Sequence, residues 1–289
     1  MRVHRLPWFV PLLTLLLAAL AAPACAADLW FRTSDGVRLH LIEAGPPRAP
    51  TIVFVPGWAM PAWIFQAQIA AFSRAYRVVA LDPRGQGDSE IPPEGYTPAR
   101  RGQDIGDLIA ALGGRPVLLV AWSLGVLDSL AYVQQYGDAR LAGLVLIDNS
   151  VGEDPPPKPS GRPLRRGPPL EREVKMRRFV QGMFRSAPGE AYLARLTDTA
   201  LHTPPDVAAR LAGYAVPRSY WRDAVYSVSK PVLYVVRPRF AGQAANLAAR
   251  HPTAETALFA EAGHALFVDE PARFNGLLDD FINRRVVWP

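Results

Sequence analysis

The fold is decided by one stretch of sequence, Pro116-Val117-Leu118-Leu119-Val120-Ala121-Trp122-Ser123-Leu124-Gly125. Apolar residues fill nearly every position from 116 to 122, which predicts a strand buried on both faces. Ser123 then follows between two small residues, Ala121 and Gly125, and a helical pattern begins at once. This arrangement is typical of a nucleophile elbow, a sharp strand-to-helix turn that presents a serine hydroxyl at the sheet edge. A serine at a helix start also serves as a simple N-cap, and the stretch alone leaves both interpretations open.

Apolar runs of strand length recur on both sides of this stretch, and helical patterns separate several of them. The predicted strands are Val37–Ala44, Thr51–Pro56, Tyr76–Asp82, Pro116–Trp122, Gly143–Asp148, Pro231–Arg237 and Glu255–Ala260. The predicted helices between and after them are Pro61–Ala75, Pro98–Leu112, Leu124–Tyr136, Gly242–Arg250 and Pro271–Arg284. Such alternation predicts an α/β fold, with a mostly parallel, doubly wound sheet and helices on both faces.

The alternation is interrupted between residues 151 and 222. Connections in α/β folds usually take about 2 to 6 residues, so a segment of this length indicates an inserted unit. It opens with seven prolines between Asp154 and Pro169 and continues with three short helical patterns, roughly at 171–185, 189–199 and 206–214. We expect a helical lid after the sixth strand, over the carboxyl ends of the strands, with residues 27–150 and 223–289 forming the core.

A second polar signal, His264, lies about 140 residues after Ser123 and follows the last predicted strand. A lone histidine in a loop is usually a polar surface residue. This one stands beside Gly263 and precedes the final predicted helix. A serine hydrolase with the chain order serine, acid, histidine keeps its general base at this place.

Four segments, in this order, resemble the α/β-hydrolase family, and within it the branch of cofactor-free haloperoxidases and esterases. They are Pro56-Gly57-Trp58, the run DPRGQGDS from Asp82 to Ser89, the elbow at Ser123, and Gly263-His264-Ala265-Leu266-Phe267. The resemblance covers roughly residues 28–151 and 225–285. It implies that Ser123 is the nucleophile and His264 the base, and that the backbone N–H groups of Trp58 and Leu124 form the oxyanion hole. The motif of Asp82 and Arg84 implies a turn-building role for both.

The acid that should orient the histidine is missing from its commoner place. Most members of the family have an aspartate after the seventh strand, where this chain reads Arg237-Pro238-Arg239-Phe240. Some haloalkane dehalogenases of the same superfamily carry the acid at the end of the sixth strand, and Asp148 stands at the matching position. Asp148 is therefore the expected third member, with Glu153 and Asp154 as alternatives. A strand-terminal turn residue is the competing interpretation of Asp148.

Aromatic residues near these segments are candidates for an acyl pocket. Trp63, Trp122 and Phe267 are the expected pocket residues, although aromatic side chains are core material by default. The chain shows neither a cluster of cysteine and histidine at metal-ligand spacing nor a glycine-rich phosphate loop. We therefore expect no metal and no cofactor.

The N-terminus predicts export. Arg2 and Arg5 precede an apolar run from Leu6 to Ala22, and small residues follow, which is the layout of a signal peptide over residues 1–26. A membrane anchor and lipidation of Cys25 are the alternatives, but the run is shorter than the roughly 20 residues that span a bilayer. Cleavage near Ala26 would place the protein in the periplasm or medium. Since Cys25 is the only cysteine, a disulfide framework is excluded.

The positive charge of the chain is concentrated in the predicted lid. The net charge is +6, yet the segment from Lys158 to Arg185 alone holds nine basic residues against two glutamates. A solvated lid surface is one interpretation, and weak contact with an anionic membrane or an acidic substrate is the other. Nucleic acid is not an expected partner, because the cluster has no aromatic interleaving.

These sequence features are compatible with three functions. The first is an exported carboxylesterase or lipase-like hydrolase for small to medium acyl esters. The second is a cofactor-free perhydrolase or haloperoxidase with the same triad. The third is a ligand-binding protein on a hydrolase scaffold, motivated by the missing acid after the seventh strand. Oligomeric state is not predicted by the sequence.

Overall fold

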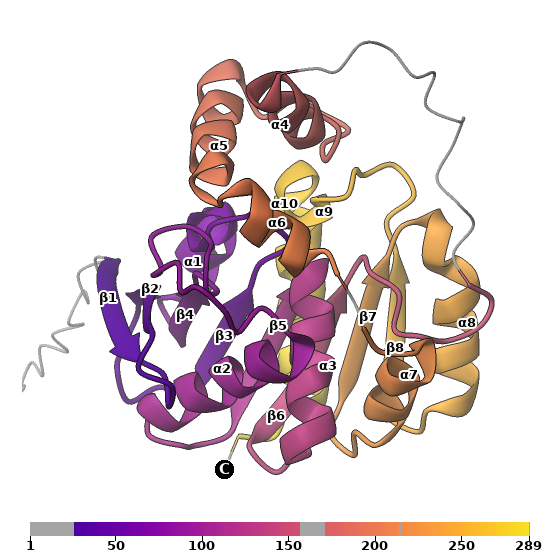
Figure 1. The fold of residues 1–289 in the computed structure, drawn as a ribbon. Helices are drawn as coiled ribbons and strands as arrows, with labels where there is room; N and C mark the ends of the chain where they lie inside the picture. The colour runs from indigo at the N-terminus through magenta and orange to yellow at the C-terminus, as the bar shows by residue number, and fades with distance from the viewer. Residues whose placement is uncertain (1–25, 157–170, 214, 289) are drawn as a thin grey trace, which may run out of the picture.

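A computed structural model describes residues 26–156, 171–213 and 215–288 (Figure 1). The predicted signal peptide lies outside these residues except for Ala26. Residues 157–170, which hold most of the prolines at the start of the predicted lid, also lie outside them.

The described residues form an eight-stranded sheet with the order β1-β2-β4-β3-β5-β6-β7-β8. The strands are β1 (Ala27–Arg32), β2 (Arg38–Ala44), β3 (Thr51–Val55), β4 (Arg77–Leu81), β5 (Val117–Trp122), β6 (Leu141–Ile147), β7 (Val232–Val236) and β8 (Ala254–Leu258). The pairs β1–β2 and β2–β4 are antiparallel, and the other five neighbouring pairs are parallel. The expected α/β fold with a mostly parallel sheet is confirmed.

Helices cover both faces of the sheet (Figure 1). One face packs against α2 (Pro98–Ala111), α3 (Leu124–Tyr136), α7 (Arg218–Tyr226) and α8 (Ala241–Arg250), and the other against α1 (Gln66–Phe72), α9 (Leu266–Asp269) and α10 (Pro271–Arg285). Side chains of a strand alternate between these two cores, because successive residues point to opposite faces. In β5, Leu119 and Ala121 enter one core while Val120 and Trp122 enter the other.

Strand β1 is absent from the predicted set. It lies at the edge of the sheet, antiparallel to β2, and most of its residues are exposed. A strand of this kind buries too little apolar surface to produce a hydrophobic run, and Leu29 and Trp30 remain exposed in the structure.

Among the described residues, four helices lie between β6 and β7. They are α4 (Arg172–Gln181), α5 (Glu190–His202), α6 (Pro205–Leu211) and α7. In Figure 1, α4 to α6 lie above the ends of the strands, and we call these three the cap helices. Helix α7 instead packs against α3 through Trp221, Ala224 and Val225 in the core. The expected boundary at residue 222 therefore falls inside a helix of the core layer.

The motif from Asp82 to Ser89 forms a turn directly after β4. Oxygens of Asp82 accept hydrogen bonds from the N–H groups of Ala62 and Asp88. Gly87 is required at its position, because an added Cβ would lie 2.2 Å from the Asp82 carboxyl carbon. Arg84 is fully buried, and its Nε donates to Asp104 over 2.6 Å. These contacts agree with the structural role that the resemblance implies.

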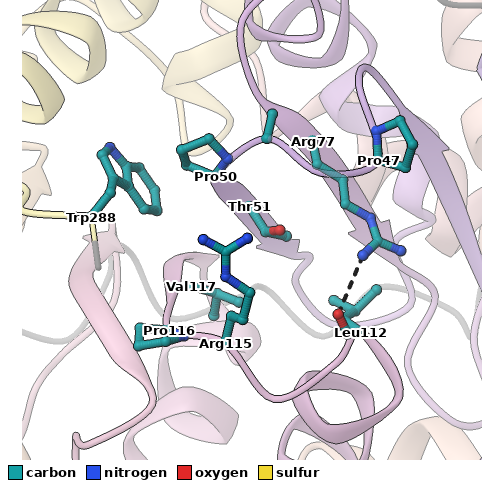
Figure 2. Close-up of a pocket in the computed structure, with 10 residues that line it drawn as sticks. Pro47, Pro50, Thr51, Arg77, Leu112, Arg115, Pro116, Val117 and Trp288 are labelled. Carbon is teal, nitrogen blue, oxygen red and sulfur yellow. Dashed lines mark hydrogen bonds between the residues drawn. The ribbon is translucent and has the colours of Figure 1, made fainter.

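A small cavity lies at the amino ends of β3 and β5, away from Ser123 (Figure 2). Arg77, Arg115 and Trp288 surround it, and its volume is about 40 Å³. Such a space holds one or two water molecules rather than a substrate. In the described part of the chain, no helix is long and apolar enough to cross a membrane.

Candidate active site

Ser123 stands in a strained turn between β5 and α3. Its backbone has φ 54° and ψ −120°, a conformation that non-glycine residues seldom adopt. The turn depends on close approach of the chain, because a Cβ on Gly125 would lie 2.4 Å from the carbonyl oxygen of Val55. The side chain of Ser123 makes no capping hydrogen bond to α3. The elbow interpretation therefore fits this geometry, and the N-cap interpretation does not.

His264 contacts the serine directly. Its Nε2 lies 2.8 Å from the Oγ of Ser123, and its Nδ1 lies 2.6 Å from Oδ2 of Asp148. An ionised carboxylate only accepts hydrogen bonds, so Nδ1 carries the proton and Nε2 accepts from the serine hydroxyl. The indole of Trp122 holds the loop that carries His264, because its Nε1 donates to the backbone carbonyl of His264 over 2.8 Å. The structure thus joins Ser123, His264 and Asp148 in one hydrogen-bonded chain.

Asp148 is a buried anion directly after β6. Oδ2 accepts from His264 and from Nε of Arg237, each over 2.6 Å, and Oδ1 accepts from the backbone N–H of Arg237 over 3.0 Å. Burial raises the pKa of Asp148, but the hydrogen bond and charge of His264 and the contacts of Arg237 outweigh it and lower the pKa below its ordinary value. Asp148 is therefore charged throughout the neutral range.

The two alternative acids lie elsewhere. Glu153 is buried and accepts hydrogen bonds from the Tyr226 hydroxyl and from the N–H of Asp154. Asp154 is exposed and lies 3.6 Å from Arg218. Among the described residues, Asp148 is the acid that contacts His264.

Two backbone N–H groups are available for an oxyanion. In the described part of the chain, the N–H groups of Trp58 and Leu124 donate to no protein acceptor, which leaves both free for a ligand. The loop that carries Trp58 is clamped by the buried side chain of Gln86, which accepts from Ala59 N over 2.7 Å and donates to Gly57 O over 3.2 Å. Sequence reasoning missed Gln86, whose one signal was its place in the DPRGQGDS motif.

Backbone strain is concentrated around these groups. Three non-glycine residues of the described chain have positive φ, namely Ala59, Ser123 and Asp148. Two are members of the hydrogen-bonded chain, and Ala59 follows Trp58. Strain of this kind clusters where a fold holds reactive groups in place.

A cleft of about 830 Å³ opens over Ser123 and His264. Its lining residues come from the elbow, the end of β6, the α4 region and the segment after β7: Trp58, Ser123, Leu124, Asp148, Asn149, Ser150, Arg178, Phe179, Gly182, Met183, Arg237, Arg239, Phe240 and His264. Trp58 also ties the cleft to the cap, because its Nε1 donates to Ala208 of α6 over 2.7 Å.

The prediction that Trp63, Trp122 and Phe267 line the pocket was wrong. Trp122 and Phe267 are fully buried and pack edge to face in the core behind His264. Trp63 packs against Tyr192 of α5 and lies under the guanidinium of Arg195, so it anchors the cap. None of the three lines the cleft. Their proximity in sequence to the site did not reveal which way their side chains point.

The residues missed by sequence reasoning lie on α4 and after β7. Phe179 and Met183 are apolar lining residues from α4 and the segment after it, and Phe240 is an apolar lining residue from the segment after β7. Arg178, Arg237 and Arg239 supply positive charge. The signal for this charge in the sequence is Arg237-Pro238-Arg239, which places two cations directly after the seventh strand.

One group of side chains has the composition of a metal site. Among the described residues, His40, Asp82 and Asp88 bring possible ligand atoms within 4.8 Å of one another. Asp82 already accepts from two backbone N–H groups and lies 2.7 Å from Nδ1 of His40. These contacts give the cluster a structural role, and it lies outside the cleft.

The comparisons with known proteins identify the family of the chain. The family model "Alpha/beta hydrolase family" matches residues 52–277, and the chain belongs to that family. It is 36% identical over 116 residues to the non-heme chloroperoxidase CPO-A1 of Kitasatospora aureofaciens, covering 40% of this chain and 42% of that one. It is 33% identical over 116 residues to the bifunctional esterase/perhydrolase DCH of Acinetobacter calcoaceticus, with the same coverage. The chain thus matches less than half the length of these relatives.

A solved structure is similar over nearly the whole chain. The esterase RhEst1 from Rhodococcus sp. ECU1013 superposes with a TM-score of 0.74 at 23% identity, covering 89% of this chain and 99% of that one. At this identity the likeness concerns the fold. The sequence similarity lies with the haloperoxidase and esterase branch that the motifs indicate.

Proposed function

We propose that the protein is a serine hydrolase that cleaves carboxylic esters of small to medium acyl chain through an acyl-enzyme. The observation that carries the proposal is the hydrogen-bonded series of Ser123, His264 and Asp148, which lies in an open cleft. A hydroxyl is a weak nucleophile until a base removes its proton, and the 2.8 Å contact with Nε2 supplies that base.

The geometry supports the following course of the proposed reaction. His264 takes the proton as Ser123 Oγ attacks the ester carbonyl, and Asp148 stabilises the imidazolium that forms. The N–H groups of Trp58 and Leu124 hold the negative oxygen of the tetrahedral intermediate. His264 then returns the proton to the leaving alcohol. Water, activated by the same imidazole, releases the acid and restores Ser123.

Ser123→Ala tests the proposal. We expect purified protein to hydrolyse p-nitrophenyl acetate and butyrate, and expect a fluorophosphonate probe to label Ser123. The variant should lose both properties while it keeps the wild-type circular dichroism spectrum. Unchanged ester turnover in Ser123→Ala would exclude the mechanism.

Perhydrolysis is a second candidate, supported by the similarity to an esterase/perhydrolase and a chloroperoxidase. Hydrogen peroxide would replace water as the acceptor of the acyl group, giving a peracid that can oxidise halide. Peracid formation from acetate and peroxide, measured by halide oxidation, separates it from plain hydrolysis. The third interpretation, a binding protein, loses its motivation because Asp148 supplies the acid that seemed to be missing.

We also propose that residues 1–26 direct export and are removed. The support is the sequence of this segment, with two arginines, an apolar run and small residues before Ala26. The intact mass of protein from the periplasmic fraction tests cleavage, with an N-terminus at Ala27 as the expected result. A lipid-modified Cys25 would indicate the lipoprotein alternative instead.

A further inference from the structure

The cleft over Ser123 carries three arginines. Arg178 comes from α4 of the cap, and Arg237 and Arg239 come from the segment after β7. Among the lining residues that the structure describes, Asp148 is the one acidic side chain, and its carboxylate is already used by His264 and Arg237. The lining therefore has an excess of positive charge.

Two of these arginines have no acidic partner. Arg178 and Arg239 form no ion pair with any residue in the described ranges. Most other arginines around the cap do have polar partners, as Arg172 donates to two carbonyls and Arg210 pairs with Asp206. Two cations without an acidic partner in the described ranges thus line the cleft.

The third arginine is only partly engaged. Nε of Arg237 donates to Asp148 over 2.6 Å, while the side chain stays 28% exposed. Its Nη2 lies 3.4 Å from Nδ1 of His264, but both nitrogens carry protons, so this contact is no hydrogen bond. The outer edge of the guanidinium therefore keeps donors for a ligand in the cleft.

The rest of the lining is apolar or neutral. Trp58 and Phe179 meet edge to face, with ring centroids 5.1 Å apart, and Met183 and Phe240 extend the apolar surface. A ligand that matches this cleft has an apolar body and an anionic group. Guanidinium groups bind carboxylates through paired, charge-assisted hydrogen bonds, and a cleft of one charge sign concentrates oppositely charged ligands.

We propose that the preferred substrates are esters that carry a carboxylate, such as half-esters of dicarboxylic acids, held by Arg178, Arg237 and Arg239 while Ser123 attacks the ester carbonyl. This inference rests on the proposed serine-hydrolase function. A membrane surface is a less suitable partner for these three side chains, because they line the same cleft as the reactive serine.

The test compares two 4-nitrophenyl esters of the same dicarboxylic acid by the release of 4-nitrophenol. One is mono-4-nitrophenyl glutarate, which is an anion at pH 7, and the other is its neutral methyl ester. We expect kcat/KM of the wild-type protein to be about tenfold higher for the anion, as one charge-assisted contact allows. The preference should fall as sodium chloride is raised, because salt screens charges that solvent reaches.

Variants assign the preference to residues. Arg178→Gln and Arg239→Gln should each reduce the ratio of kcat/KM between the anionic and the neutral ester severalfold. Arg222→Gln is the matched control, since Arg222 is a partly exposed arginine of α7 outside the cleft and its substitution should leave the ratio unchanged.

The outcomes distinguish the two levels of the proposal. Equal turnover of both esters, abolished by Ser123→Ala, would overturn the anion preference and keep the hydrolase. An anion preference that survives both arginine substitutions would overturn the assignment to these residues. Turnover that survives Ser123→Ala would remove the proposed function itself. Binding to phosphatidylglycerol vesicles without any ester preference would assign the arginines to a membrane surface instead.

Discussion

Asp148 and Arg237 follow neighbouring parallel strands, and the carboxylate of one is held by the guanidinium of the other at 2.6 Å. The position after β7, where most of the family has its acid, is occupied here by a cation. The acid lies at the end of the adjacent strand, and both side chains lie next to Nδ1 of His264, with Oδ2 of Asp148 at 2.6 Å and Nη2 of Arg237 at 3.4 Å. Arg237 alone would repel the imidazolium of His264. The Asp148 carboxylate neutralises Arg237 and also stabilises the imidazolium.

Asp148→Asn tests this arrangement. The amide keeps the shape but loses the charge that orients and stabilises His264, and it leaves Arg237 unpaired next to the imidazole. We expect kcat for p-nitrophenyl butyrate to fall by about 10³ to 10⁴-fold, with intact folding by circular dichroism.

Glu153→Gln is the matched control for that variant. Glu153 is another buried carboxylate close in sequence, but it contacts Tyr226 rather than His264. Its substitution should change kcat less than threefold, on the order of 1 kcal/mol or below. If the two variants lost activity equally, Asp148 would have no special role in the reaction.

Gln86→Leu tests whether the loop of Trp58 needs its clamp. The substitution keeps the volume but leaves the N–H of Ala59 and the carbonyl of Gly57 without their partner. Because the Trp58 N–H lies between these two groups, we expect the direction of this N–H to change. The fall in kcat should then be about 10 to 100-fold, which is smaller than the fall expected when an oxyanion donor is lost completely.

The affinity of a boronic acid inhibitor measures this effect separately from stability. A boronate forms a tetrahedral adduct with the serine, so its affinity should fall in parallel with kcat, while KM changes little. A lower melting temperature with unchanged kcat and unchanged boronate affinity would mean that Gln86 is structural only.

Much of this site was predictable because its parts are local in sequence. The elbow needs Gly125 next to a buried strand, and His264 must follow the last strand, so both appear as short patterns. Asp148 required one further step, from an empty position after the seventh strand to an acid at the neighbouring strand end. The sheet itself followed from runs of apolar residues.

Side-chain direction and long-range packing could not be predicted in the same way. Trp63 and Phe267 lie within a few residues of site segments, yet they pack against the cap and the core. Arg178 enters the cleft only because α4 folds over it from an insertion whose register no local pattern specifies. Edge strand β1 buries too little surface to produce a signal.

Gly125→Ala should disrupt the elbow. The new Cβ would lie 2.4 Å from one backbone oxygen and 2.7 Å from another, which forces β3 and the start of α3 apart. We expect destabilisation of about 3 kcal/mol or more, or failure to fold. Gly276→Ala, in α10 with no atom within 4 Å of the added Cβ, should instead stabilise by about 1 kcal/mol. Urea unfolding of both variants measures the difference, and similar values would contradict the packing argument.

His40 and His251 should affect stability with opposite dependence on pH. Burial lowers the pKa of His40, but its hydrogen bonds with Asp82 and Asp28 and the charges of Asp82 and Asp88 outweigh it and raise the pKa above the ordinary value of 6.5. Its contribution to stability is then fully present below pH 6.5 and is lost as the pH rises through the higher folded value. For His251, burial is the main cause of a lowered pKa, so its protonation costs stability as the pH falls below 6.5.

Thermal unfolding of His40→Gln and His251→Gln at pH 5.5 and pH 9 tests both signs. The loss of melting temperature in His40→Gln should be larger at pH 5.5, by on the order of 2 °C for each 1 kcal/mol of linkage. The loss in His251→Gln should be larger at pH 9, because at pH 5.5 the wild-type protein already carries the cost of protonating that histidine. A larger loss at pH 9 in His40→Gln would contradict the role of its ion pair with Asp82, and a larger loss at pH 5.5 in His251→Gln would contradict the cost of protonating His251.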